Sequence, residues 1–89
     1  MALSPEQSRA GRAWLEWSQE QLAERANVSL STVRDFEKGR RTPIANNLAA
    51  LGGALAKAGV RPVFAADGKP AGIAFDDAGL AAGQSGSTP

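Results

Sequence analysis

The sequence predicts a mainly α domain of four to five helices that ends in a small β-hairpin. Serine residues at positions 4, 18 and 29 each stand directly before a stretch that favours a helix, as N-cap residues do. Apolar residues within these stretches recur at spacings of three and four, which indicates one buried helix face. After Val60 the apolar period shortens, and an Asp-Gly pair at 67–68 is typical of a hairpin turn.

Composition limits the class of protein. A chain of 89 residues forms one domain whose core is near the lower limit of independent stability. It contains neither cysteine nor histidine, and no serine has a candidate activating partner, so we expect no enzyme, no metal and no cofactor. No apolar run approaches the roughly 20 residues of a membrane span, and a signal-peptide pattern is missing. We therefore expect a cytoplasmic protein without a membrane partner, and nothing implies a small-molecule ligand.

The first helix begins at Pro5, after Ser4 as N-cap, and should run to about Glu16. Proline is favoured at the first helical position, and Gln7 stands at the position that completes a capping box. We expect Trp14 and Trp17 to lie in the core, packed on the later helices. The alternative for Trp14 is a surface that binds a partner.

The second helix begins after Ser18, where Gln21 completes another capping box. Its apolar face is formed by small or medium side chains, namely Leu22, Ala23 and Ala26. Asn27 follows where the chain must turn sharply, and asparagine tolerates positive φ better than other non-glycine residues. Val28 should then point inward.

The third helix should extend from Leu30 to Lys38, with Ser29 as N-cap and Gly39 just beyond its end. At 100° per residue, Val33 and Phe36 point one way. The residues that point the other way are polar: Ser31, Arg34, Asp35 and Lys38. This pattern fits a helix that enters the major groove of DNA, but an ordinary solvated face has the same pattern. The net charge of +1 is small, although Arg34, Lys38, Arg40 and Arg41 form a local basic cluster against Asp35 and Glu37.

A loop at 40–43 leads to a fourth helix over about 45–58, whose Leu48, Leu51 and Leu55 are spaced by three and four. Gly52 and Gly53 weaken this helix by about 1 kcal/mol each relative to alanine. Either another helix or a second subunit approaches closely there, or the helix is locally weak. Two short strands follow, at 60–64 and 72–75. Residues 77–83 have the pattern of a weak helical turn, and 84–89 that of a disordered tail.

Three segments resemble one known family at its characteristic spacing. They are SQEQLA at 18–23, NVSLSTV at 27–33 and FEKGRRTP at 36–43. Together they are similar to the helix-turn-helix of the Cro/C1-type (XRE) family of bacterial and phage DNA-binding regulators. The resemblance covers about 3–75, and it is strongest at 12–43.

The resemblance implies a lambda-repressor-like DNA-binding domain at 1–59, with the helix-turn-helix at 18–39. A β-hairpin or dimerisation element at 60–76 and a flexible tail at 77–89 complete the expected organisation. The implied function is a sequence-specific transcriptional regulator, a repressor that binds double-stranded DNA as a homodimer on an inverted repeat in the bacterial nucleoid. Two alternatives remain: a DNA-binding antitoxin that also neutralises a toxin protein, and a protein-interaction module that does not bind DNA.

The resemblance also implies the site residues. The helix at 30–38 would contact bases through Leu30, Ser31, Arg34 and Asp35. Contacts to phosphates would come from Gln19, Thr32, Lys38, Arg40 and Arg41. Leu30 either contacts a thymine methyl group or packs beside Val33. Asp35 either accepts from a cytosine amino group or holds Arg34 in place, and we favour the second. Relatives pair an arginine with a glutamate at the positions of Arg12 and Glu37, so we expect that ion pair here.

Dimerisation should involve the hairpin, because its apolar residues are not needed by the helices or by DNA. These residues are Val63, Phe64, Ile73 and Phe75. An exposed strand edge is a ready site for pairing with a second copy. The C-terminal half of the helix at 45–58 would be a second contact. The alternative is a hairpin that only covers its own helical core.

Overall fold

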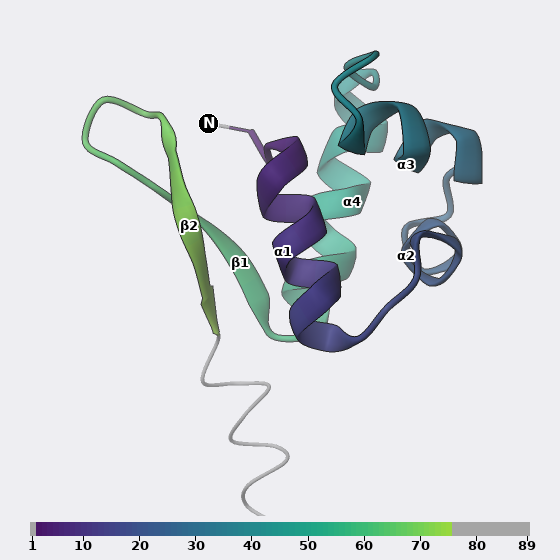
Figure 1. The fold of residues 1–89 in the computed structure, drawn as a ribbon, viewed down its shortest axis with the longest axis horizontal. Coiled ribbons are helices and arrows are strands. Elements are labelled where there is room, and N and C mark those ends of the chain that lie inside the picture. The colour runs from purple at the N-terminus through teal and green to yellow at the C-terminus, as the bar shows by residue number, and fades with distance from the viewer. Residues whose placement is uncertain (1, 76–89) are drawn as a thin grey trace, which may run out of the picture.

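The structure is a computed structural model that describes residues 2–75. It contains α1 (Pro5–Leu15), α2 (Gln19–Ala26), α3 (Leu30–Glu37), α4 (Ala45–Lys57), β1 (Val60–Phe64) and β2 (Pro70–Phe75). The predicted fold class, mainly α with a C-terminal β-hairpin, is confirmed (Figure 1). The helical turn and the tail predicted after residue 76 lie outside the described residues. Within 2–75, none of the helices has the length and apolar character required to cross a bilayer.

The helix ends follow from their capping residues. Both predicted capping boxes are present: Gln7 N donates to Ser4 Oγ over 3.0 Å, and Gln21 N donates to Ser18 Oγ over 3.0 Å. Ser29 Oγ accepts from Thr32 N at the start of α3. Asn27 ends α2 in the left-handed conformation, with φ of 56°, as predicted. These caps satisfy backbone donors and carbonyls that a helix end leaves unpaired.

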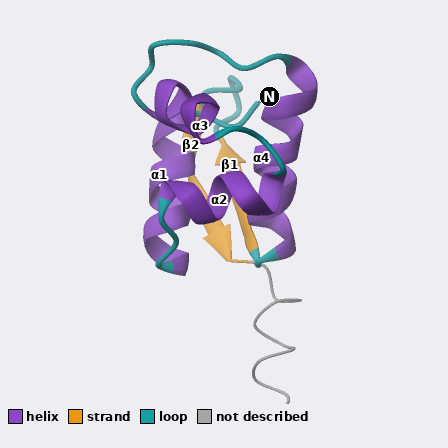
Figure 2. Cartoon of the chain, turned by 90° about the vertical axis from the view of Figure 1, so that its right-hand side faces the viewer, coloured by secondary structure: helices purple, strands orange, loops and turns teal. Residues whose placement is uncertain are grey.

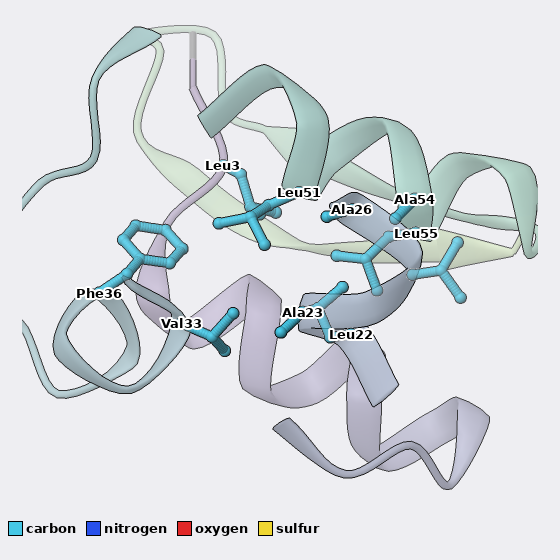
Figure 3. Close-up of a cluster of buried hydrophobic side chains, with 10 residues drawn as sticks. Leu3, Leu22, Ala23, Ala26, Val33, Phe36, Leu51, Ala54 and Leu55 are labelled. Atoms are coloured by element: carbon cyan, nitrogen blue, oxygen red, sulfur yellow. The ribbon is translucent and has the colours of Figure 1, made fainter. Parts of the chain in front are cut away.

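The core lies where α2, α3 and α4 face one another (Figure 3). The side chains of Leu22, Val33, Leu51 and Leu55 are at most 1% exposed. Phe36 is also buried, and Val28 packs against this cluster as predicted. The predicted apolar faces of these helices are therefore the ones that pack together.

The prediction that Trp14 lies in the core is wrong. Trp14 is 56% exposed and stacks on Phe75 at the end of β2, with ring centroids 3.8 Å apart. The buried face of α1 is formed by Gln7, Ser8 and Gly11, and the rotation of 100° per residue places Trp14 at the edge of that face. Trp17 is half-buried against the core, where the Arg25 guanidinium lies 4.4 Å from its ring centroid.

The hairpin is antiparallel, and it lies on the far side of α1 and α4 from α2 and α3 (Figures 1 and 2). The first strand has its predicted bounds, whereas the second begins at Pro70, two residues earlier than predicted. Val60 is buried, and Ile73 packs against the core. The buried Gln7 side chain donates from Nε2 to the carbonyl oxygens of Val63 and Gly72, over 2.9 Å each. The hairpin is therefore fixed to α1 by both apolar and polar contacts.

The helix α4 continues through Gly52 and Gly53 without interruption. A Cβ atom built on either glycine would meet nothing within 4 Å, so no other helix within residues 2–75 approaches them. Of the alternatives for this pair, close approach of another helix is therefore wrong for the part of the chain that the structure describes. The close approach occurs instead at Gly11, where a Cβ would lie 3.2 Å from Leu55 Cδ2 and 3.3 Å from Val60 Cγ1.

Gly53→Ala is expected to raise the free energy of unfolding by about 1 kcal/mol, because alanine favours a helix and the position is open. Gly11→Ala is the matched comparison, and it is expected to lower stability because its new methyl group crowds two buried side chains. Urea unfolding of both variants measures these changes. A Gly53→Ala variant that is less stable than the wild type would show that position 53 is not open to a methyl group.

Candidate nucleic-acid interface

The helix α3 exposes a polar ridge because its apolar residues are turned inward. Val33 and Phe36 are buried in the core cluster that also contains residues of α2 and α4, whereas Ser31, Arg34 and Lys38 are exposed. The helix lies at the surface on the face that is turned toward the viewer in Figure 2. A protruding helix with exposed polar side chains has the form needed to enter a major groove about 12 Å wide.

A hollow lies on each side of this ridge. One, of about 210 Å³, separates α3 from the start of α2 and is lined by Ser18, Gln19, Glu20, Leu30 and Arg34. The other, of about 240 Å³, separates α3 from the loop before α4 and from its first turn; its lining includes Thr32, Arg41, Thr42 and Asn47. Both hollows have polar side chains in their lining, although Pro43 and Ile44 also line the second one. A helix with a hollow on each side can enter a groove that is bordered by two sugar-phosphate strands.

The charges of this face are mainly positive, because the acidic residue at the end of α3 is withdrawn from it. Arg34, Lys38, Arg40 and Arg41 are all exposed. Glu37 is only 2% exposed and contacts α1 instead. Of the two acids that the sequence places among these four cations, Asp35 remains on this face, and the exposed Glu20 borders the smaller hollow beside Arg34. The structure therefore leaves a basic surface on a nearly neutral protein.

The buried Glu37 carboxylate is surrounded by hydrogen-bond donors. Arg12 Nη2 lies 2.7 Å from Oε1, and Arg12 Nε lies 2.9 Å from Oε2. Ser8 Oγ donates to Oε2 over 2.5 Å, and Gln19 Nε2 donates to Oε1 over 3.1 Å. The structure thus brings Arg12 and Glu37 together, with additional donors from α1 and α2. These contacts fix the end of α3 to both preceding helices.

Sequence reasoning did not identify Ser8 or Arg9 as part of this network. Ser8 and Arg12 are four residues apart, so they share one face of α1, but the spacing does not show what that face contacts. Arg9 donates to the backbone carbonyl of Glu37, close to the C-terminus of α3, where a cation is favourable. Arg12 also donates from Nη1 to the carbonyl oxygen of Trp17, over 3.0 Å.

The pKa of Glu37 lies below its ordinary value of 4.5. Burial alone would raise this pKa, but the hydrogen bonds from Arg12, Ser8 and Gln19 and the charge of Arg12 together outweigh burial. A carboxyl group whose pKa falls on folding stabilises the fold above its unfolded pKa. This contribution is lost as the pH falls through the folded pKa.

We therefore expect the stability difference between the wild type and Glu37→Gln to depend on pH. The ionised carboxylate should make the wild type more stable at pH 7, and this advantage should shrink below pH 4.5, the ordinary pKa of the group. Thermal melting of both proteins between pH 7 and pH 3 measures this difference. Parallel melting curves over the whole range would contradict the role assigned to the charge.

The structure places the two ambiguous base-contact candidates as follows. Leu30 is half-buried and packs against the core, on the side of Val33, and it also borders the smaller hollow. The Asp35 carboxylate lies 4.0 Å from Arg40 Nη1, and within the described residues it forms no ion pair with Arg34, so its role beside Arg34 stays a prediction. Arg34 and Asp35 are adjacent, so their side chains point about 100° apart on the helix. Arg40 lies near Asp35 because its backbone N–H donates to the Asp35 carbonyl oxygen over 2.9 Å.

The phosphate-contact candidates occupy both flanks of α3. Gln19 borders the smaller hollow, although its amide also donates to Glu37. The Thr32 hydroxyl lies 2.7 Å from Ser29 Oγ, beside the larger hollow. Lys38, Arg40 and Arg41 are exposed at and beyond the end of α3, where Gly39 adopts a φ of 75°. The structure therefore brings these five residues to one face, around the same helix.

Comparison with known proteins agrees with this geometry. A family model described as helix-turn-helix, of the Cro/C1 type, matches residues 9–58, which is more than half of the chain. No curated protein matches the chain significantly. The matched range begins in α1 and ends just after α4, so it contains α3 and, of the residues that contact Glu37, all except Ser8.

Proposed function

Because the chain belongs to the Cro/C1-type helix-turn-helix (XRE) family of DNA-binding regulators, we propose that it represses transcription by binding a specific operator through α3. The observation that supports this most strongly is the asymmetry of α3. Its apolar side and its acidic Glu37 face the protein, while Ser31, Arg34 and Lys38 face outward between two hollows. Such a protein would act at the nucleoid.

In this proposal Arg34 is the principal base-contacting residue. Its guanidinium group is exposed on the ridge and can form a bidentate contact with guanine O6 and N7. Ser31 would contact an adjacent base. Leu30 and Asp35 flank these two residues and would have smaller roles, because Leu30 also packs on the core and Asp35 lies near Arg40.

Contacts to phosphates would fix the position of α3 in the groove. Gln19 would act from one side, together with the first turn of α2, since helix N-termini favour anions. The other candidates act from the opposite side or the end of α3: Thr32, Lys38, Arg40 and Arg41. These contacts would supply affinity and salt dependence rather than sequence preference.

A homodimer is part of the proposal. One recognition helix contacts too few base pairs for selective binding, so a two-fold dimer on an inverted repeat is the expected assembly. The hairpin lies away from α3, and its Val63, Phe64, Ile73 and Phe75 are half-buried or exposed. It can therefore contact a second copy without blocking the DNA-binding face.

Selection of duplexes from a randomised pool tests this function. The wild-type protein is expected to enrich one sequence that contains two inverted half-sites, and its affinity should fall steeply as the salt concentration rises. Failure to enrich any sequence, or binding that is independent of salt, would exclude a sequence-specific DNA-binding role.

A further inference from the structure

The outer edge of β2 has unpaired backbone groups. Pro62 of β1 stands opposite Ile73, and opposed residues in an antiparallel pair exchange either two hydrogen bonds or none. Proline has no N–H group, so the N–H and C=O of Ile73 point away from β1. Phe75 stands opposite Val60, two residues further along the strand, so its N–H and C=O also point away from β1. The outer edge of β1 lacks the donor of Pro62, so β2 presents the better edge for another strand.

An apolar groove of about 500 Å³ follows this edge, between β2 and α1. Its α1 wall includes Gln7 and Ala10, and its β2 wall includes Pro70, Ala71 and Ile73. Ala10 and Ala71 are both exposed, and their small side chains leave room above them. A strand that pairs with β2 would place alternate side chains in this groove.

An exposed aromatic pair lies at one end of the same edge. The rings of Trp14 and Phe75 are stacked with an interplanar angle of 20°, and they are 56% and 37% exposed. Stacking on each other covers only part of their surfaces. The molecule thus carries an apolar protrusion and an apolar groove along one strand, an arrangement that can be complementary to itself.

A two-fold axis through Ile73 matches these two features. If β2 pairs antiparallel with the β2 strand of a second copy at Ile73, Phe75 of each copy stands opposite Ala71 of the other, the residue that the register shift between Val63 and Phe64 leaves without a partner on β1. The aromatic pair then lies over the small residues that line the groove.

We propose that the second copy binds through β2, so that two hairpins form one four-stranded sheet and each Trp14–Phe75 pair fills the partner's groove. This inference rests on the proposed function, which requires a homodimer, and it specifies the edge and the register. The partner is a second copy of this chain, because the aromatic pair and the groove both lie along β2. A two-fold axis through this strand therefore brings the aromatic pair of each copy to the groove of the other.

Ala10→Arg tests the proposal, because it places a long charged side chain in the groove at an exposed helical position. It is expected to raise the dissociation constant of the dimer at least about tenfold. Ala49→Arg is the matched control: Ala49 is exposed on α4, where it lines a different apolar groove, and this variant should dimerise like the wild type. Sedimentation velocity over a range of concentrations measures both, with circular dichroism to confirm folding.

Amide hydrogen exchange at Ile73 provides a second measurement. Exchange should slow as the wild-type protein becomes dimeric, because the Ile73 N–H acquires a partner, and it should stay fast in Ala10→Arg. The proposal is overturned if only Ala49→Arg dissociates the dimer. It is also overturned if the wild type is a monomer that occupies an inverted repeat, which would leave the groove to another protein. Binding of Ala10→Arg to a duplex with one half-site tests the DNA-binding function separately.

Discussion

Replacing Glu37 by alanine is expected to lower the free energy of unfolding by about 3–5 kcal/mol, because it leaves Arg12 without its buried partner. The Glu37 side chain is 1% exposed and accepts hydrogen bonds from Arg12, Ser8 and Gln19. Its loss therefore leaves several donors unsatisfied at the junction of α1, α2 and α3. In a domain of this size, a loss of this magnitude lowers the melting temperature by roughly 12 °C or more.

Glu24→Ala is the matched control, since Glu24 is an exposed glutamate on α2 and its removal should change the melting temperature little. Arg12→Ala should be about as damaging as Glu37→Ala, because it leaves an unpaired buried carboxylate. Thermal melting of the three variants compares them. A shift of only a degree or two in Glu37→Ala would show that the pair does not hold the helices together.

Arg34→Ala is expected to weaken binding to the selected operator by about 1–3 kcal/mol, which is roughly 5- to 150-fold in the dissociation constant. The guanidinium group is exposed on the ridge of α3, so its loss removes a base contact without disturbing the core. Preference at one base pair per half-site should relax at the same time. Titrations of the operator and of its single-base variants measure both effects.

Lys38→Ala is the matched comparison, because Lys38 is exposed on the same helix side but stands at its end. It should weaken binding to the operator and to random DNA about equally. The slope of the logarithm of the binding constant against the logarithm of the salt concentration should fall by about one released ion. An Arg34→Ala variant that weakened both DNAs equally would assign Arg34 to phosphate rather than to a base.

Local signals explain why most of the fold could be predicted. The capping boxes at Ser4 and Ser18 and the turn at Asn27 depend on residues at most a few positions apart, and the structure forms each of them. The buried faces of α2, α3 and α4 follow from helical spacing in the same way. The resemblance to the family added the Arg12–Glu37 pair, which joins residues 25 positions apart and which no local pattern indicates.

Features that depend on contacts between distant segments could not be predicted. The exposure of Trp14 follows from how α1 sits against β2, where its ring finds Phe75. The donors Ser8 and Arg9 were missed because their partner, Glu37, belongs to another helix. Asp35 lies near Arg40 because the chain turns back after Gly39, whose φ is 75°. In each case the tertiary arrangement decides what a polar or aromatic side chain contacts.

Titration of the isotope-labelled protein with its selected operator, followed by NMR, tests the central claim most directly. The largest shifts are expected at the backbone amides of α3, including Ser31 and Arg34, and at the start of α2 near Gln19, while a scrambled duplex should affect these amides much less. Shifts confined to the hairpin and to Trp14, or equal shifts with both duplexes, would contradict sequence-specific binding through α3.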